Sequence, residues 1–550
     1  MAGATPIAAL LDILRTEGVE MIFGNPGTTE LPLIAALADA PDLQYVLATQ
    51  ELSAVAMADG YARATGRVGF VSLHVAAGVA NGLIGMLNAR RSRTPLVVVA
   101  GQQDRRHLIH DPMLSGDLVA LATPATKHAV EVTRATDLPL VLRRAFRLAV
   151  TPPAGPVFVS IPMDVLTEDV VVDVPRRSPA APPGAAADPA TAVALLRGAR
   201  RPAIVAGDGI GREGAIGELV ALAETLGATV YHQPMNDGID VPTGHRLYAG
   251  MLPPRHDAIR AALAQHDVVL VVGAHAFSPH HYTPGPAIPA GVQVVQIDSD
   301  AAEIGRTFAV DAALVGAIGP TLAALVRALD PVGPDAVDRA ADLASTQRGD
   351  LDAQALALYG SAPLAPLAAM HAVAAGLPPD AVVVEEAITA GLLLRALLRQ
   401  ERPRSYVHTV GGGLGWGIGA AVGSRLGNPE RPVVAVLGDG SALFGVQGLW
   451  SAVRYQVPVT FIVVDNGEYR TLKETLDRTR AHAGRYVGLD LAPPRLDWCA
   501  AAAFFGMDAA LIGSTDELRT AVAGAPGRDT PLLLQVPVHG HVPPNSDTAS

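Results

Sequence analysis

The 550-residue chain is too long for one hydrophobic core, so we expect roughly two to four domains. Hydrophobic residues make up 49% of the chain and charged residues 17%, which excludes general disorder. The net charge of −12 disfavours nucleic acid and anionic membranes as partners. The single cysteine, Cys499, excludes an intramolecular disulfide and a zinc site built from several thiolates.

The beginning of the chain predicts a helix, with Thr5 as its cap and Pro6 in its first turn. The segment has no basic stretch, and Asp12 interrupts its apolar run, so we do not expect a signal peptide. No run of 18 apolar residues predicts a membrane-spanning helix. We therefore expect a cytoplasmic protein.

Short apolar runs alternate with helical patterns, which is typical of βαβ units with buried parallel strands. Val174–Pro189 predicts an extended linker, and Asp330–Pro366 a helix with a linker. We expect an α/β protein with three doubly wound parallel-sheet domains, at residues 1–175, 190–330 and 365–540, of which the first and third could share a fold. The predicted strands are Met21–Gly24, Tyr45–Gln50, Val68–Leu73, Leu96–Ala100, Ala203–Ala206, Val268–Val272, Val292–Ile297, Ala381–Val384, Val433–Leu437, Val459–Val464 and Leu532–Val536.

The clearest pattern is a βαβ unit in the third block, whose helix is predicted at about Leu443–Tyr455. Asp439 and Asn466 each follow the carboxyl end of a strand in this unit, so their side-chain oxygens should meet at one sheet edge. Mg²⁺ prefers such hard oxygen ligands and completes its shell with phosphate and water. The predicted turn Gly438–Ser441 would be an ordinary tight turn if it stood alone, but its pairing with a second turn at Asn466–Glu468 favours a metal and diphosphate site.

A glycine-rich stretch, Val410–Gly423, lies upstream of that unit. Its glycines allow the backbone to approach a ligand closely, although tight packing of a helix on the sheet is the alternative.

Polar side chains also follow the predicted strands of the first block: Thr28, Glu51, His74 and Gln102. In an open parallel sheet these positions line the ligand crevice. Glu51 could instead be a charge that stabilises a helix N-terminus, and His74 could be a core histidine. The small residues that follow His74 weaken that second alternative.

Together these patterns resemble the thiamine-diphosphate enzymes. The resemblance rests on the GDG turn, a helix and an asparagine turn in the third block. It also rests on FGNPG-x-x-ELP, LH-x-AAG and AGQQ in the first block and FSPHHYTPG in the middle block. The combination is more similar to benzoylformate decarboxylase than to acetolactate synthase or pyruvate decarboxylase.

The resemblance implies thiamine diphosphate and Mg²⁺ as cofactors. Asp439 and Asn466 would bind the metal by side chain and Glu468 by its backbone oxygen. Leu414 would support the bent cofactor, and the Gly412 carbonyl would accept from its 4′-amino group. The implied cofactor-binding set is Gly412, Leu414, Gly440, Ser441, Tyr469 and Thr389.

The implied catalytic residues are Glu51, His74, His280 and Thr28. Glu51 would bond to the aminopyrimidine ring of the cofactor, and His280 matches the catalytic histidine by register, although His281 is adjacent. The implied activity is decarboxylation of a 2-oxo acid to an aldehyde and CO₂. By the same resemblance each site combines two subunits, so the partners expected are a small 2-oxo acid, an aldehyde acceptor and further copies of the chain, in a dimer or a tetramer.

The chain departs from the pattern around the substrate. Thr28 stands where a serine is expected, and His408 where an aromatic residue is expected. Arg470, Thr471 and Thr475 replace a smaller and more apolar set. We therefore expect a more polar 2-oxo acid than benzoylformate as an alternative substrate.

Three other functions stay open at this point. The first is a carboligase or lyase that forms or cleaves 2-hydroxy ketones, as acetolactate synthase does. The second is a cofactor-binding scaffold without turnover. The third is a nicotinamide dehydrogenase, which rests only on Gly209, Gly211 and Gly214 in a G-x-G-x-x-G pattern and leaves the two turns of the third block unexplained.

Overall fold

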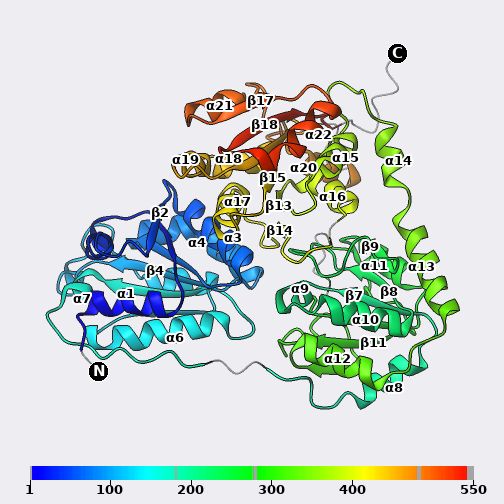
Figure 1. The fold of residues 1–550 in the computed structure, drawn as a ribbon, viewed down its shortest axis with the longest axis horizontal. Coiled ribbons are helices and arrows are strands. Elements are labelled where there is room, and N and C mark those ends of the chain that lie inside the picture. The colour runs from blue at the N-terminus through cyan, green and yellow to red at the C-terminus, as the bar shows by residue number, and fades with distance from the viewer. Residues whose placement is uncertain are drawn as a thin grey trace. The chain divides into compact units, whose positions relative to one another are not determined.

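The computed structural model describes residues 3–179, 183–275, 277, 282–399, 401–479 and 485–541. Over these residues the chain forms three six-stranded parallel sheets with helices packed against them, which confirms the predicted fold class (Figure 1). The described part of the chain contains no helix that is both long and apolar enough to cross a membrane.

The first sheet has the strand order β2-β1-β3-β4-β6-β5. Its strands are β1 (Met21–Gly24), β2 (Gln44–Leu47), β3 (Gly69–His74), β4 (Leu96–Gln102), β5 (His128–Glu131) and β6 (Val157–Pro162). Its helices are α1 (Pro6–Thr16), α2 (Leu31–Leu37), α3 (Glu51–Thr65), α4 (Val75–Arg91), α5 (Leu118–Ala122), α6 (Leu138–Val150) and α7 (Met163–Thr167). Helix α1 begins as predicted, because the Thr5 hydroxyl accepts a hydrogen bond from the Ala8 amide.

The second sheet has the order β12-β11-β10-β7-β8-β9. Its strands are β7 (Pro202–Ala206), β8 (Thr229–His232), β9 (Tyr248–Met251), β10 (Val268–Val272), β11 (Gln293–Asp298) and β12 (Ala312–Val315). The helices of this part are α8 (Ala190–Gly198), α9 (Gly209–Glu213), α10 (Ile216–Leu226), α11 (His256–Leu263), α12 (Ile318–Ala328), α13 (Pro334–Arg348) and α14 (Leu351–Leu356). Alternate residues of β10 enter two separate hydrophobic clusters, because helices cover both faces of this sheet.

The third sheet has the order β14-β13-β15-β16-β18-β17. Its strands are β13 (Val382–Glu386), β14 (Tyr406–His408), β15 (Val433–Gly438), β16 (Val459–Asp465), β17 (Asp508–Leu511) and β18 (Leu532–Pro537). The helices are α15 (Pro366–Gly376), α16 (Ile388–Leu397), α17 (Trp416–Gly427), α18 (Asp439–Gly445), α19 (Gly448–Arg454), α20 (Arg470–Thr479), α21 (Trp498–Phe504) and α22 (Thr515–Ala523).

The first and third sheets share one strand order: second, first, third, fourth, sixth, fifth. In each, the order reverses between the first and third strands of that sheet, and ligands of such sheets bind beyond the carboxyl ends of the strands at this point. The loops after β1 and β3 in one sheet, and after β13 and β15 in the other, therefore mark the two places where chemistry is expected.

The chain forms two compact units. The first unit consists of Met1–Pro179, Leu358–Leu394 and Thr409–Ser550, and the second of Ala180–Ala357 and Arg395–His408. The first unit thus contains most of the first and third sheets, and each unit is described below by itself.

Helices α3 and α17 hold the first unit together. They pack so closely that a Cβ added at Gly60 would lie 2.0 Å from the carbonyl oxygen of Ala420, which only glycine allows. The indole nitrogen of Trp416 donates to the buried carboxylate of Asp59 at 2.7 Å. These contacts fix the position of the first sheet relative to the third within this unit.

The predicted helix Leu443–Tyr455 is corrected by the structure. Helix α18 begins already at Asp439, with Gly438 as its N-cap, so residues 439–441 are helical and not part of a turn. A second helix, α19, follows after a break between Gly445 and Gly448. Both glycines pack against the segment around α17, and glycine is a poor helix former, which explains the break.

Candidate active site

The loop after β1 places a buried carboxylate beside the histidine that ends β3. Glu30 is 4% exposed and accepts hydrogen bonds from the amides of Gly27 (2.9 Å) and Gly101 (2.8 Å). Its Oε2 lies 2.8 Å from Nδ1 of His74, and the hydroxyl of Thr29 donates to its Oε1 at 2.8 Å. A buried carboxylate is tolerated when it is hydrogen-bonded in this way.

These contacts determine which ring nitrogen of His74 carries the proton. Thr29 Oγ1 also lies 3.0 Å from Nδ1, and since its own proton goes to Glu30, this oxygen acts as an acceptor toward the ring. Nδ1 is therefore protonated, and Nε2 is the nitrogen that remains for chemistry. The next residue, Val75, has a φ of 44°, a conformation that β-branched residues rarely adopt and that is typical of functional turns.

Glu51 is the first residue of α3 and is 7% exposed. The side-chain amides of Asn25 and Asn81 donate to its two oxygens at 3.3 and 3.0 Å. Its position at a helix N-terminus, which the sequence analysis allowed as an alternative, also stabilises the charge. The carboxylate is thus buried, oriented and supplied with donors, so it is poised to share a proton with a ligand nitrogen.

The other residues predicted for this part of the site make no hydrogen bond to Glu51 or His74 in the described part of the chain. Thr28 is exposed at the start of the short 3₁₀ helix Thr28–Glu30, whereas Thr29 is the threonine that contacts His74. Gln102 ends β4, and its amide donates to the carbonyl oxygen of Gly116 at 2.9 Å. His280 and His281 lie outside the described residues.

On the third sheet, the carboxylate of Asp439 lies against the turn that follows the neighbouring strand. Asp439 is 3% exposed, and its Oδ1 accepts from the amide of Gly440 at 2.8 Å. Its Oδ2 accepts from the amide of Gly467 at 2.7 Å, which joins the first residue of α18 to the turn after β16, as their pairing in the sequence predicted. Burial raises the pKa of Asp439 to about 6, against the lowering effect of these amides. A cation bound here would favour the ionised carboxylate.

The turn itself is held by its own side chains and by a buried lysine. Asn466 Oδ1 accepts from the amide of Glu468 at 3.0 Å. Lys473, on α20 and 7% exposed, forms ion pairs with the side chain of Glu468 and with Asp490, the latter at 2.5 Å. Lys473 was not predicted from the sequence. Among the described residues there is no group of three or more His, Cys, Asp and Glu side chains that could hold a metal, and the expected Mg²⁺ ligands do not require one.

Several residues predicted to contact the cofactor lie around this turn. A Cβ added at Gly440 would lie 2.8 Å from the ring of Tyr469, so glycine is needed there. Ser441 is buried in the first turn of α18. The hydroxyl of Thr389, near the start of α16, lies 2.7 Å from the hydroxyl of Thr471 on α20.

The glycine-rich loop before α17 is held by an asparagine from α4. Nδ2 of Asn88, a fully buried residue, donates to the carbonyl oxygen of Gly413 at 2.8 Å, and its Oδ1 accepts from the Gly413 amide at 3.0 Å. Gly412 beside it is exposed, has a φ of 78°, and has no atom within 4 Å of an added Cβ. Leu414 is half-buried. Asn88 was also missed from the sequence, since it looks like an ordinary polar residue of an apolar helix.

Helix α4 therefore contacts both Glu51 of the first sheet's part of the site and the glycine-rich loop before α17. Asn81 donates to Glu51, and Asn88, seven positions later on the same helix, holds Gly413. Seven residues span about 10 Å along a helix. Within one chain Glu51 and the glycine-rich loop thus contact the same helix about two turns apart.

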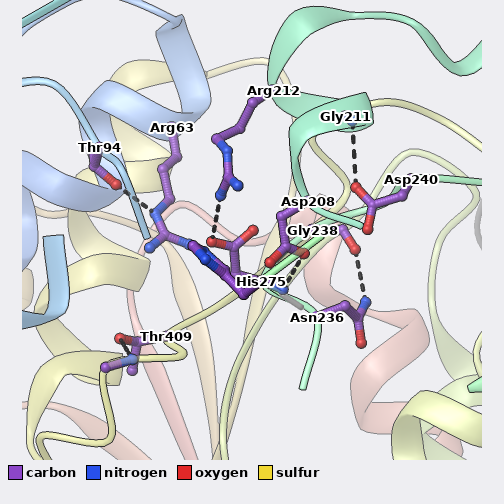
Figure 2. A network of polar contacts seen from close by, with 12 residues as sticks. Arg63, Thr94, Asp208, Gly211, Arg212, Asn236, Gly238, Asp240, His275 and Thr409 are labelled. Carbon is purple, nitrogen blue, oxygen red and sulfur yellow. Dashed lines mark hydrogen bonds and ion pairs between the residues drawn. The ribbon is translucent and has the colours of Figure 1, made fainter. Parts of the chain in front are cut away.

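The glycine-rich turn after β7, in the second unit, carries carboxylates where a dinucleotide would need open amides. The amide of Gly211 donates to Oδ1 of Asp240 at 3.3 Å (Figure 2). Asp208 Oδ1 accepts from the amide of Asp237 at 2.8 Å, and Arg212 forms an ion pair with Asp237 at 3.0 Å. The Gly211 amide is therefore already hydrogen-bonded and not open to a pyrophosphate, which argues against the dehydrogenase hypothesis.

Comparison with known proteins gives consistent results along the chain. Family models of thiamine pyrophosphate enzymes match it three times: the N-terminal TPP binding domain at residues 5–120, the central domain at 190–325 and the C-terminal TPP binding domain at 389–536. The chain is 36% identical over 540 residues to benzoylformate decarboxylase of Pseudomonas aeruginosa, covering 96% of this chain and 98% of that protein.

The chain is also similar to a second curated protein and to a solved structure. The chain is 30% identical over 555 residues to the putative acetolactate synthase large subunit IlvX of Mycobacterium tuberculosis, covering 96% of this chain and 98% of the relative. Among solved structures, the thiamine diphosphate-dependent 4-hydroxybenzoylformate decarboxylase of Rhodococcus jostii RHA1 aligns with a TM-score of 0.86 at 31% identity, covering 98% of this chain and all of the other.

Proposed function

The chain belongs to the thiamine pyrophosphate enzymes, and from this premise we propose that it decarboxylates a 2-oxo acid, giving an aldehyde and CO₂. The observation that carries the proposal is the pairing of two features in one unit. The buried carboxylate of Asp439 lies against the Asn466–Glu468 turn, and the oriented His74 and Glu51 occupy the equivalent edge of a sheet with the same topology.

The donor set fits thiamine diphosphate, which is the same compound as thiamine pyrophosphate, bound through Mg²⁺. Asp439 and Asn466 offer a carboxylate and an amide oxygen, and Glu468 a backbone oxygen, which are the hard ligands that Mg²⁺ prefers. The open space beside Gly412 leaves its backbone accessible to a ring. When bound, this cofactor supplies an electron sink for the carbanion that remains after CO₂ leaves.

The chain's own residues would then orient the cofactor, bind the substrate and transfer protons. Glu51, held by two asparagine amides, would accept a hydrogen bond from the aminopyrimidine and favour its reactive form. Nε2 of His74, fixed by Glu30, would hold or deliver a proton at the reacting carbonyl. Thr28, exposed at the same loop, would donate to the substrate carboxylate, and His280 would act as a second proton donor.

We propose that two copies of the chain complete each site, in a dimer or a tetramer. The first unit exposes large apolar side chains on both sides of the glycine-rich loop: Ile84 (40% exposed) and Leu87 (46%) on α4, and Leu443 (38%) and Phe444 (52%) on α18. An added Cβ at Gly413 would meet Ile84, and one at Gly415 would meet Phe444, so these side chains flank the loop directly. Such exposed apolar groups beside a functional loop are typical of subunit interfaces. The cytoplasmic location expected from the sequence stays a prediction.

The substrate is proposed to be a 2-oxo acid at least as polar as benzoylformate. Arg470 donates to Glu474 at 2.8 Å, and Thr475 donates to the carbonyl oxygen of Thr471 at 2.8 Å. The hydroxyl of Thr471 faces Thr389. Helix α20 therefore presents hydrogen-bonding groups next to the metal turn, and a site with such groups discriminates against apolar substrates.

A second candidate function is carboligation, in which the acyl carbanion adds to an aldehyde or a second 2-oxo acid. The similarity to a putative acetolactate synthase along nearly the whole chain favours keeping it. The two functions share every residue discussed above, because they differ only in what the carbanion meets.

One experiment separates the two. Purified protein with thiamine diphosphate and Mg²⁺ is given a panel of aromatic and polar 2-oxo acids, with and without acetaldehyde or benzaldehyde, while CO₂, aldehyde and hydroxy ketone are measured. Stoichiometric CO₂ and aldehyde support decarboxylation, and hydroxy ketone as the main product supports carboligation. No CO₂ from any acid in the panel would contradict both.

A further inference from the structure

A cavity of about 360 Å³ lies in the second unit, in a place that the proposed function does not use. It is lined by the edge strand β9, by the connection between α13 and α14, and by the segment at the end of α16. The volume is in the range of small-molecule sites in proteins.

The cavity is positively charged, although the chain as a whole carries a net charge of −12. Three arginines line it, Arg348, Arg395 and Arg399, against two carboxylates, Asp350 and Asp352, which gives 3 − 2 = +1. Arg399 pairs with Asp352 at 2.9 Å, and Asp350 caps the first turn of α14 with its carboxylate. Among the three lining arginines, Arg395 and Arg399 have interaction partners within the described chain, whereas Arg348 has none.

Arg348 and Arg395 differ in their surroundings. Arg348 is half-buried and forms no hydrogen bond or ion pair with another residue that the structure describes. Burial raises the pKa of Tyr248 on β9, and the nearby charge of Arg348 opposes that rise, which locates the guanidinium beside the cavity wall. Arg395 is 9% exposed. The half-buried guanidinium of Arg348, which has no such partner among the described residues, is best stabilised by an oxyanion that meets its fork of donors.

The walls indicate how large the occupant is. Gly250 and Gly349 have φ of 101° and 64°, and neither has an atom within 4 Å of an added Cβ, so the cavity is open beside both. A recess of about 20 Å³, lined by His232, Tyr248 and Tyr406, adjoins the cavity and shares Tyr248, Arg395 and Leu398 with it. That recess has room for about one water molecule and not for a ring or an alkyl chain. An occupant larger than a water molecule is therefore confined to the main cavity, beside the arginines.

The geometry points to this cavity as a binding site for a small oxyanion, the phosphate or carboxylate group of a metabolite, recognised by Arg348 with Arg395 in the adjoining wall. The site is separate from the glycine-rich turn after β7, whose Gly211 amide is already bonded to Asp240. It does not depend on the proposed function, because none of its residues belongs to the candidate active site.

The test is a calorimetric titration of the protein saturated with thiamine diphosphate and Mg²⁺, so that the cofactor site cannot bind the probe. The probes are inorganic phosphate, glycerol phosphate and succinate. We expect binding with a dissociation constant of about 1 mM or lower for at least one probe. A preference for the two phosphates identifies a phosphorylated ligand, and a preference for succinate identifies a carboxylate.

Arg348→Gln is expected to weaken this binding about tenfold, because it removes a charge-assisted hydrogen bond. Arg327→Gln is the matched control: Arg327 is exposed on α12 in the same unit and does not line the cavity, so affinity should be unchanged. Arg395→Gln is the second test, with thermal unfolding to check that it folds. Absence of binding for all three probes at about 10 mM, or equal affinity in R348Q and R327Q, would overturn the proposal.

Discussion

Oε2 of Glu30 lies 2.8 Å from Nδ1 of His74, at the point where the loop after β1 reaches the end of β3. The glutamate is buried and receives further hydrogen bonds from two backbone amides and from Thr29. It therefore cannot rotate away, and it fixes both the orientation and the tautomer of the imidazole. In this respect Glu30 is a positioning residue for the histidine that we expect to handle protons.

Replacing Glu30 by Gln should lower kcat by about 10- to 100-fold while the protein stays folded. Glutamine has one carbonyl oxygen for the donors that now share two carboxylate oxygens, and its amide nitrogen would face a donor. The ring of His74 would lose its fixed tautomer, so the pH profile of kcat/KM should change as well. Steady-state kinetics across pH and ¹⁵N NMR of the imidazole measure both effects.

Glu20→Gln is the control for that experiment. Glu20 is exposed and pairs with Arg67 at the surface, where an ion pair contributes little, so the same chemical change should leave kcat and the pH profile as they are. If E30Q kept the parent kcat and the parent imidazole tautomer, the positioning role of Glu30 would be wrong.

Glu51→Gln should slow activation of the cofactor by about 100-fold or more. Asn25 and Asn81 donate to both carboxylate oxygens, and an amide nitrogen in place of one oxygen would face a donor and could not accept a proton. Hydrogen–deuterium exchange at C2 of the bound cofactor and single-turnover decarboxylation report this step. Cofactor affinity in the same variant serves as the control and should change less than about threefold, since the metal turn is untouched. An unchanged exchange rate would remove Glu51 from the mechanism.

The sequence predicts most central strands because they are buried on both sides and form continuous apolar runs, although the buried central strands β6 and β8 were missed. Seven strands were not predicted: β5, β6, β8, β9, β12, β14 and β17. Five of them, β5, β9, β12, β14 and β17, are at sheet edges. β5, β9, β12 and β17 are partly exposed there, so their apolar pattern is weak, and β14 is buried but has only three residues. The predicted strand Tyr45–Gln50 was too long, because Gln50 already caps α3 with its side chain.

In the candidate site, residues of one βαβ unit could be predicted from the sequence, whereas residues that the fold brings together from distant segments could not. Asp439 and Asn466 could be paired from the sequence, since both follow strands of one βαβ unit. Glu30, Asn88 and Lys473 could not, because each acts on a residue brought near by the fold or by a neighbouring turn. Their residue types carry no signal by themselves: a glutamate in a loop, an asparagine in a helix and a lysine after a turn are ordinary surface choices.

Asp439→Asn should weaken Mg²⁺-dependent binding of thiamine diphosphate by about 100-fold or more. The substitution keeps the size of the side chain but removes its charge and one of the two oxygens that now accept from Gly440 and Gly467. Titration of the apo protein with cofactor at several Mg²⁺ concentrations gives the affinity and its dependence on metal.

The neighbouring buried carboxylate offers a matched control. Asp465 is 6% exposed, and its Oδ2 accepts from the side chain of Gln535 at 2.8 Å, away from the turn amides. Asp465→Asn should cost about 1 kcal/mol of stability and leave the metal dependence intact. Equal loss of metal-dependent binding in both variants would show that the turn responds to any change in buried charge and that Asp439 is not a specific ligand.

The carboxylates of the second unit predict how stability depends on pH. Burial, and then the charge of Asp237, raises the pKa of Asp240 to about 7. Burial also raises the pKa of Asp208 well above its usual value. The folded protein therefore keeps a proton on Asp240 that the unfolded chain releases near pH 4. The stability that this proton provides is fully present below about pH 4 and is lost as pH rises toward 7.

Asp240→Asn removes that titration but keeps a carbonyl oxygen for the Gly211 amide. Between pH 5 and pH 7.5 the parent should lose about 2 kcal/mol more stability than the variant, which corresponds to several degrees in Tm. Differential scanning calorimetry at both pH values measures the difference, and Asp330→Asn, at an exposed position of the same unit, should follow the parent. If the parent and D240N lost the same number of degrees, Asp240 would be ionised throughout this range, and Arg212 would be balancing a fully charged cluster.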